Sequence, residues 1–148
     1  MTRIDFYILE GADDRNADGT TIACRVAEKA YQAGHRVYIH AGDAPQAERL
    51  DQLLWTFRQG SFVPHQRLAP GEAADPLTPV HIGWDGEPEP HDDVLINLTA
   101  EVPLFFSRFQ RVAEIVPADE GAKQQGRTRY KFYRDRGYQL EMHTLTPG

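Results

Sequence analysis

The sequence has few of the features that mark secreted or membrane proteins. Its 148 residues include one cysteine, Cys24, so no internal disulfide can form, which is usual in the reducing cytoplasm. No apolar run approaches the roughly 20 residues of a membrane-spanning helix. The N-terminus also lacks a basic segment followed by an apolar signal segment. We therefore predict a cytoplasmic protein without membrane contacts, folded as one domain over residues 1–148.

Catalytic and metal-binding motifs are also missing. The six histidines are scattered, with no His-x-x-x-His pair and no second cysteine to complete a zinc site. There is no Gly-x-Ser-x-Gly motif. Residues 11–19 have neither a Gly-x-Gly-x-x-Gly fingerprint nor a phosphate-loop Gly-Lys-Ser/Thr, and their three Asp residues would repel a pyrophosphate. We predict no catalytic residues, no metal and no cofactor.

The hydrophobic pattern predicts alternating strands and helices. A strand over residues 3–9, a helix ending at Gly34 and a strand over 35–40 make a βαβ unit, whose strands should be parallel. Residues 58–79, rich in Pro and Gly, are expected to form no regular element. The other predicted elements are a helix capped by Asp43, strands at 80–84 and 94–98, a short helix near Leu104, a strand at 112–116, a helix at 123–136 and a strand at 138–144. This alternation predicts a three-layer α/β domain with a mostly parallel central sheet.

Positive charge is concentrated near the C-terminus. Residues 123–136 contain six Lys or Arg and one Asp, a net charge of +5 in a chain of net charge −6, so the remainder carries −11. On a helix, five side chains fall within about one third of the circumference: Lys123, Arg127, Tyr130, Lys131 and Arg134. Like-charge pairs four residues apart destabilise a helix by roughly 0.2–0.5 kcal/mol each, so a face that retains them suggests a binding role. A merely solvated basic face is the open alternative.

Two kinds of acidic ligand suit such a face. Aromatic rings beside cations bind single-stranded nucleic acid. They equally suit a short acidic peptide, whose carboxylates need a cation and whose aromatic side chain needs an apolar wall. The acidic remainder of the chain would repel a long polyanion, which favours the peptide.

A second group of aromatic residues surrounds the end of the helix that Asp43 caps. Trp55, Phe57, Phe62 and Val63 lie within nine positions of one another. Trp and Phe are enriched in interface hot spots, yet they are also common core residues. Both roles stay open on the residues alone, and Trp84, at a strand end, has the same ambiguity.

Taken together, segments over nearly the whole chain resemble the chi subunit family of the bacterial DNA polymerase III holoenzyme. The most specific pairing is Trp55 six residues before Ser-Phe-Val-Pro-His, followed by Arg-Tyr-Lys-x-Tyr-Arg. The matching segments, in order, are Phe-Tyr-Ile-Leu at 6–9, Leu-Asp-Gln-Leu-Leu-Trp at 50–55, Ser-Phe-Val-Pro-His at 61–65, Pro-Val-His-Ile-Gly-Trp at 79–84, Val-Leu-Ile-Asn-Leu at 94–98, Ile-Val-Pro at 115–117 and Arg-Thr-Arg-Tyr-Lys-Phe-Tyr-Arg at 127–134.

The resemblance implies a Rossmann-like fold without a cofactor and a non-catalytic role in DNA replication. The family bridges the clamp loader, through the psi subunit, to single-stranded DNA-binding protein (SSB), so DNA is contacted only indirectly. In that family the acidic C-terminal tail of SSB, which ends in Pro-Phe, binds beside the basic helix. The residues that the resemblance assigns to this tail are Val116, which would line the pocket for the terminal Phe, and Lys123, Arg127, Tyr130 and Lys131.

The resemblance also assigns Trp55 and Phe62 to the psi-facing surface, which favours the interface role of Trp55. Segments 69–78 and 85–93 do not match the family, so neither receives a function from it. Gly126 within the basic helix costs about 1 kcal/mol relative to Ala and is expected to loosen that helix.

Two rival functions belong to different classes. A nucleotide-binding α/β enzyme would show a shift in melting temperature with ATP or NAD. A direct single-stranded DNA-binding module would retain oligonucleotides in the absence of SSB, with a steep dependence on salt.

Overall fold

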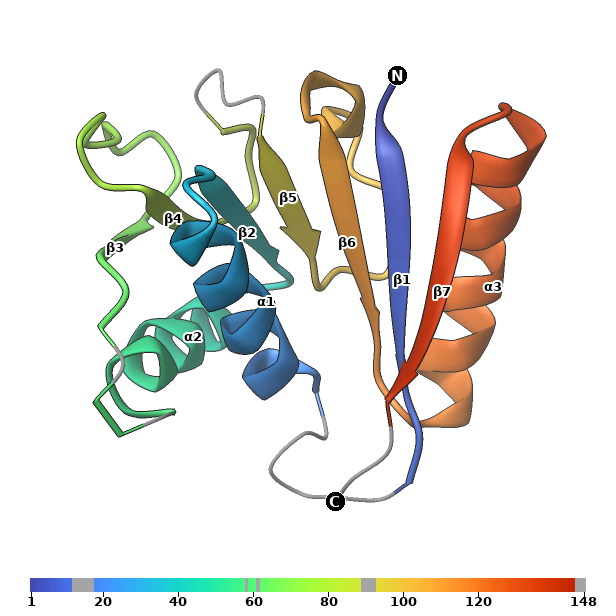
Figure 1. The fold of residues 1–148 in the computed structure, drawn as a ribbon, viewed down its shortest axis with the longest axis horizontal. Coiled ribbons are helices and arrows are strands. Elements are labelled where there is room, and N and C mark those ends of the chain that lie inside the picture. The colour runs from blue at the N-terminus through green and yellow to red at the C-terminus, as the bar shows by residue number, and fades with distance from the viewer. Residues whose placement is uncertain (12–17, 58, 61, 89–92, 146–148) are drawn as a thin grey trace.

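The computed structural model describes residues 1–11, 18–57, 59–60, 62–88 and 93–145. Most of the Asp-rich loop at 11–19 and part of the turn at 85–93 lie outside these ranges. The elements, in chain order (Figure 1), are β1 Arg3–Leu9, α1 Thr20–Gln32, β2 Val37–Ala41, α2 Ala44–Thr56, β3 His65–Leu68, β4 Val80–Trp84, β5 Val94–Asn97, the 3-10 helix η2 Phe106–Arg108, β6 Arg111–Val116, α3 Glu120–Asp135 and β7 Gln139–Leu145.

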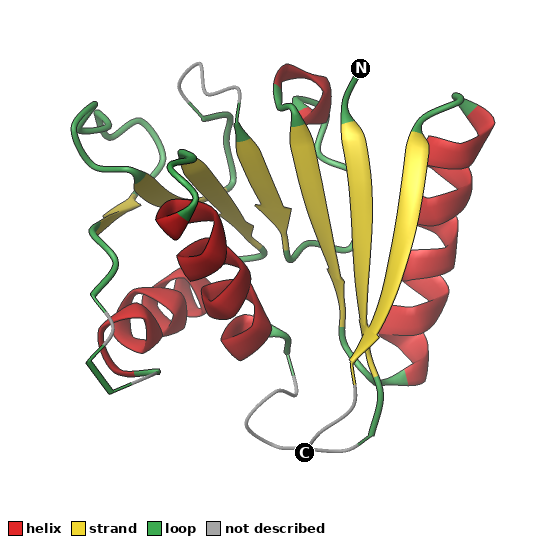
Figure 2. Ribbon diagram, viewed as in Figure 1, coloured by secondary structure: helices red, strands yellow, loops and turns green. Residues whose placement is uncertain are grey.

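One sheet of seven strands organises the described part of the chain. Its strand order is β3-β4-β2-β5-β6-β1-β7, and every neighbouring pair is parallel. Helices α1 and α2 cover one face, and α3 covers the other face beside β7 (Figure 2). The predicted three-layer α/β, Rossmann-like fold is therefore confirmed, and the sheet is parallel throughout rather than mostly parallel.

The sheet has a separate apolar core on each face, because successive side chains of a strand point to opposite sides. Under α1 and α2, β2 contributes Val37, Ile39 and Ala41, which pack with Leu50 and Leu54 of α2. The core on the α3 side is more aromatic, and its buried members are Ile4, Phe6, Tyr38, Leu95, Phe105, Phe106, Phe109, Val112, Val116 and Tyr133. No helix in the described ranges is long and apolar enough to cross a membrane.

Local sequence signals set the helix ends. The Asp43 carboxylate accepts a hydrogen bond from the Gln46 backbone N–H at 2.8 Å, which caps α2 as predicted. Gly34, at a φ of +88°, follows the end of α1 in the left-handed region that favours glycine. The basic helix begins at Glu120, before the predicted start at 123, because the Asp119 side chain caps it through the Ala122 N–H at 2.9 Å.

The segment at 58–79 differs from the prediction because it contains a strand. The four residues of β3, His-Gln-Arg-Leu, pair with β4 at one edge of the sheet. Because most of these residues are polar, the sequence shows no hydrophobic periodicity that would predict this strand. The following loop is tied to the sheet, since the Asp75 carbonyl accepts from His81 at 2.9 Å and its N–H donates to the Gln66 side chain at 2.8 Å.

Near the other edge of the sheet, at β1 and β7, charged residues lie on the face of the sheet that α1 and α2 cover elsewhere. Asp5, in the middle of β1, accepts a hydrogen bond from Arg111 at 3.0 Å and lies 3.2 Å from Nε2 of His143. Arg3 pairs with Glu141 across β1 and β7. These polar contacts cover a part of the sheet that neither α1 nor α2 reaches (Figure 1).

We predict that His40 makes the stability of the fold depend on pH. Burial lowers the pKa of His40 to about 4, and among the described residues nothing bonds its Nδ1. An unfolded histidine titrates near 6.5, at its ordinary pKa. Between these values the unfolded chain binds a proton that the folded chain does not, so stability falls as the pH drops through this window.

Urea unfolding at pH 7 and pH 4.5 measures this effect. The wild type should lose about 1–3 kcal/mol more between the two pH values than His40→Phe, whose ring suits the neighbouring Tyr38 and Phe105. His35→Asn serves as the control for a histidine outside this aromatic cluster. Equal losses in the wild type and His40→Phe would contradict the prediction.

Candidate functional site

The inner face of α3 is set by three small or polar residues. Gly126, Arg129 and Tyr133 are the buried residues of this helix, and they fall at spacings of three and four. The opposite face is therefore exposed, because positions three and four apart share one side of a helix. The helical geometry that the sequence predicts for residues 123–136 thus brings Lys123, Arg127 and Lys131 to one side.

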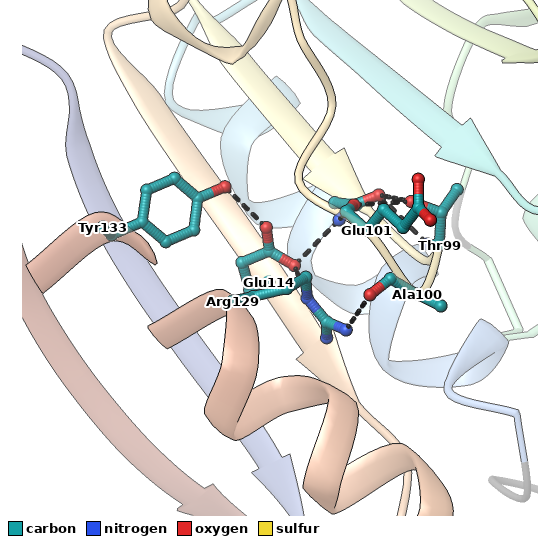
Figure 3. A network of polar contacts seen from close by, with 7 residues as sticks. Thr99, Ala100, Glu101, Glu114, Arg129 and Tyr133 are labelled. Carbon is teal, nitrogen blue, oxygen red and sulfur yellow. Dashed lines mark hydrogen bonds and ion pairs between the residues drawn. The ribbon is translucent and has the colours of Figure 1, made fainter. Parts of the chain in front are cut away.

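A buried carboxylate holds this inner face on the sheet (Figure 3). Glu114 of β6 is fully buried, and its Oε1 accepts hydrogen bonds from Arg129 Nε at 2.8 Å and Asn97 Nδ2 at 2.9 Å. Its Oε2 accepts from the Tyr133 hydroxyl at 2.7 Å. Arg129 also donates to the Ala100 carbonyl at 3.0 Å. Burial raises the pKa of Glu114, whereas the guanidinium of Arg129 acts in the opposite direction.

The sequence did not predict this network, which lowers the number of positive charges that residues 123–136 can present to a ligand. Arg129 is buried and paired with Glu114, so its charge is not presented to a ligand. The available signal was Glu114 itself, a lone acid within the apolar run Val-Ala-Glu-Ile-Val of β6. An acid there needs a buried partner, because an unpaired buried charge is strongly unfavourable.

Gly126 has a structural role that the sequence prediction overlooked. A Cβ at this position would lie 3.1 Å from both methyl groups of Val116, so the missing side chain lets α3 approach β6 closely. The expectation of a looser helix considers only helix propensity, whereas here the glycine allows packing. Val116 itself is 3% exposed. It would contribute to a pocket only as part of the floor beneath the helix.

The outer surface of α3 carries the remaining predicted residues, which we call the basic face: Lys123, Arg127, Tyr130 and Lys131. Arg127 and Lys131 are exposed and form no ion pair with any residue in the described ranges. Lys123 is different, because its Nζ lies 3.6 Å from Oε1 of Glu10. The ring of Tyr130 packs edge-on against Phe6 at 5.6 Å, which anchors it beside the cations.

A second exposed surface, the aromatic patch, consists of Trp55 and Phe62. Trp55, in the last turn of α2, is 50% exposed and Phe62 is 63% exposed, with their ring centroids 5.5 Å apart. The other two members of the predicted group point inward, since Val63 is fully buried and Phe57 packs against the core. Trp84 also packs against that core. The structure therefore places Val63, Phe57 and Trp84 in or against the core and leaves Trp55 and Phe62 exposed.

His65 supports the aromatic patch from below. Its ring centroid lies 4.6 Å from that of Trp55, and its side chain is fully buried. Nδ1 lies 2.7 Å from the Val63 carbonyl oxygen, and Nε2 lies 3.1 Å from the Asp51 carbonyl oxygen and 3.1 Å from its carboxylate. All three oxygens are acceptors, so both ring nitrogens of His65 lie within hydrogen-bonding distance of an acceptor.

The two surfaces lie at opposite edges of the sheet. The aromatic patch borders β3, the first strand in the sheet order, whereas α3 packs on β6 and β7 near the last strand. The two surfaces are also on different faces, because α2 and α3 cover opposite sides (Figure 1). A ligand on one surface would leave the other accessible.

Other candidate reactive groups in the described structure are either buried or already in ion pairs. Burial raises the pKa of the Cys24 thiol to about 12, which leaves it protonated and a poor nucleophile at neutral pH. Asp5, Glu141 and His143 could offer three ligand atoms within 4.8 Å of one another. The guanidinium groups of Arg3 and Arg111, however, already pair with both carboxylates.

Comparisons with known proteins identify the relatives of this chain. The family model described as DNA polymerase III chi subunit, HolC, matches residues 1–141. The DNA polymerase III subunit chi of Pseudomonas aeruginosa is 43% identical over 145 residues, covering 98% of each chain. Its counterpart in Escherichia coli is 36% identical over 149 residues, covering 97% of this chain and 99% of the relative.

Solved structures with a similar fold are much more distant in sequence. Saccharomyces cerevisiae Dbp5 bound to RNA and ADP BeF3 gives a TM-score of 0.60 at 12% identity, with 98% of this chain matching 41% of that chain. Domain 2 of the DEAD-box helicase Mss116p, bound to an RNA duplex, gives a TM-score of 0.65 at 9% identity over 98% of this chain and 64% of that one. At such identities the likeness concerns the fold alone.

We predict that the Glu114 network is a main source of the stability of α3. Glu114→Ala leaves the Arg129 guanidinium buried without its carboxylate, and breaking a buried ion pair in this way costs about 3–5 kcal/mol. Chemical denaturation followed by circular dichroism measures the loss. Glu141→Ala, which removes an exposed partner of Arg3, is the matched control and should cost below about 1 kcal/mol. A Glu114 variant as stable as this control would contradict the prediction.

Proposed function

Because the chain belongs to the DNA polymerase III chi subunit family, a replication accessory subunit, we propose that it acts as a non-catalytic bridge. One end would bind the psi subunit of the clamp loader, and the other would bind the acidic C-terminal tail of SSB. In this role the protein works in the cytoplasm at the replisome, and it reaches DNA only through SSB.

The observation that carries the tail-binding proposal is the pair of exposed cations on α3. Arg127 and Lys131 lie one helical turn apart, and no described residue neutralises either side chain. Both are therefore ready to receive carboxylates, and Arg127 can hold one through two parallel hydrogen bonds. Tyr130 lies between them in the sequence and offers an aromatic wall for a terminal Phe. Val116 would complete the floor of this site.

The charge of the protein favours a short peptide over a long polyanion. The chain has a net charge of −6, and the basic face is confined to one side of one helix. A nucleic acid strand that extended beyond α3 would meet an acidic surface. A tail of a few residues stays within the basic face. The resulting contact is weak in isolation, but several tails on one SSB assembly raise the local concentration.

The aromatic patch supports the second half of the bridge. Trp55 and Phe62 are among the few large apolar side chains exposed on the described surface. Exposed aromatic pairs on a rigid base are typical anchors of protein interfaces. The rigid base here is the buried ring of His65, bonded to Val63 and Asp51. We therefore assign this patch to psi, and its distance from α3 allows both partners to bind at once.

For the tail site, we predict that Arg127→Ala or Lys131→Glu weakens binding of the SSB tail at least tenfold. Each variant removes a charge-assisted contact worth about 1.5–3 kcal/mol, and about 1.4 kcal/mol corresponds to a tenfold change in Kd. Fluorescence anisotropy of a labelled acidic peptide ending in Asp-Ile-Pro-Phe measures the affinity at low and moderate salt.

Arg108→Ala is the matched control, because it removes an exposed arginine just before the first residue of β6, whereas Val116 is the last residue of that strand. The peptide without its terminal Phe should also bind poorly. Unchanged affinity in both α3 variants would refute the assigned site. Retention of oligonucleotides without SSB, or a shift in melting temperature with ATP or NAD, would instead support the DNA-binding or nucleotide-binding alternative.

For the psi site, we predict that Trp55→Ala weakens binding of psi by about thirtyfold or more, since interface anchors contribute about 2 kcal/mol or more. Leu104→Ala, which truncates an exposed apolar side chain on another part of the surface, is the control. Isothermal titration with purified psi measures both. The Trp55 variant should still bind the SSB tail peptide normally. A loss of both activities, or of neither, would contradict the separation of the two surfaces.

A further inference from the structure

We infer that Glu10 is a built-in competitor of acidic ligands for Lys123, and that it thereby sets the affinity of the basic face. This inference rests on the proposed tail-binding function. Its physical basis is the ion pair between Lys123 Nζ and Glu10 Oε1, which lie 3.6 Å apart. The carboxylate of Glu10 therefore occupies the position that a ligand carboxylate would take beside Lys123.

Both members of this pair are held in place by their backbones. The N–H of Glu10 donates to the Leu145 carbonyl at 2.8 Å, which fixes the residue at the end of β1 beside β7. The N–H of Lys123 donates to the Asp119 carbonyl at 3.0 Å in the first turn of α3. The two residues therefore stay adjacent whether or not a ligand is present, and only their side chains need to move.

The pair is also accessible to a ligand. The Lys123 side chain is 23% exposed and that of Glu10 is 47% exposed. Partly exposed ion pairs are weak, typically below about 1 kcal/mol. A peptide carboxylate can therefore displace Glu10, but it exchanges one ion pair for another. Lys123 then adds less to binding than Arg127 or Lys131, neither of which has a carboxylate partner among the described residues.

This exchange gives the basic face selectivity for strongly acidic ligands. A peptide with one carboxylate can use Arg127 and leave the Glu10 pair intact. A peptide with several carboxylates can also occupy Lys123, although Glu10 then remains close by and repels it. Removing the Glu10 charge should therefore tighten the binding of acidic peptides, with the increase depending on the presence of Lys123.

The test is a double-mutant cycle with Glu10→Gln, Lys123→Ala and the double variant, using the labelled peptide ending in Asp-Ile-Pro-Phe. Glu10→Gln is expected to tighten binding about threefold to fivefold at low salt, as loss of a screened surface pair allows. In the Lys123→Ala background the same substitution should change the affinity less than twofold. Lys123→Ala should accordingly weaken binding more in the Glu10→Gln background than in the wild type.

Glu87→Gln is the matched control, because it removes one acidic charge and one exposed ion pair, with Arg108, away from α3. It should leave the affinity unchanged, and thermal unfolding checks that every variant is folded. If the wild type binds the peptide but Glu10→Gln binds no tighter, the inference fails while the tail site stands. An equal gain with and without Lys123 would also overturn it. If the folded wild type does not bind, the proposed function fails and the inference fails with it.

Discussion

The buried carboxylate of Glu114 is the contact on which the position of α3 depends. It joins β6 to Arg129 and Tyr133 of the helix and to Asn97 at the end of β5, so one group links three elements. An acid in this position is tolerated only because both of its oxygens receive donors. With Arg129 and Tyr133 fixed inward, Arg127 and Lys131 must point outward. The geometry of the exposed face therefore follows from a contact that no ligand touches.

The parallel sheet gives the molecule two well-separated surfaces. Its strand order places β3, beside the aromatic patch, and β7, beside α3, at opposite edges. The two edges differ in their surroundings. Near β3, a loop is held to the sheet by the hydrogen bond between Asp75 and His81, and near β7, ion pairs surround Asp5. A rigid sheet between the two surfaces holds them apart, as the proposed bridging function requires. This arrangement suits a protein that links two partners better than one that brings two reactants together.

The sequence predicted the layered fold and the outer side of α3 because both follow from periodicity. Strands at 80–84 and 94–98 and the alignment of Lys123, Arg127 and Lys131 need only local spacing. The sequence did not predict the strand β3, because pairing at the edge of a sheet does not require apolar residues. The Glu114 network and the fit of Gly126 against Val116 were not predicted for another reason, because they join residues of different elements. Spacing within one element cannot reveal such contacts.

The balance of energies explains how an exposed helix can carry unpaired positive charge. The like-charge pairs Lys123/Arg127 and Arg127/Lys131 each destabilise α3 by roughly 0.2–0.5 kcal/mol. A buried ion pair with its hydrogen bonds resists disruption by about 3–5 kcal/mol, which is several times larger. The inner face therefore decides whether the helix forms, and the outer face need not be optimised for stability. Its cations can be kept for a ligand, with Glu10 beside Lys123 moderating their combined charge.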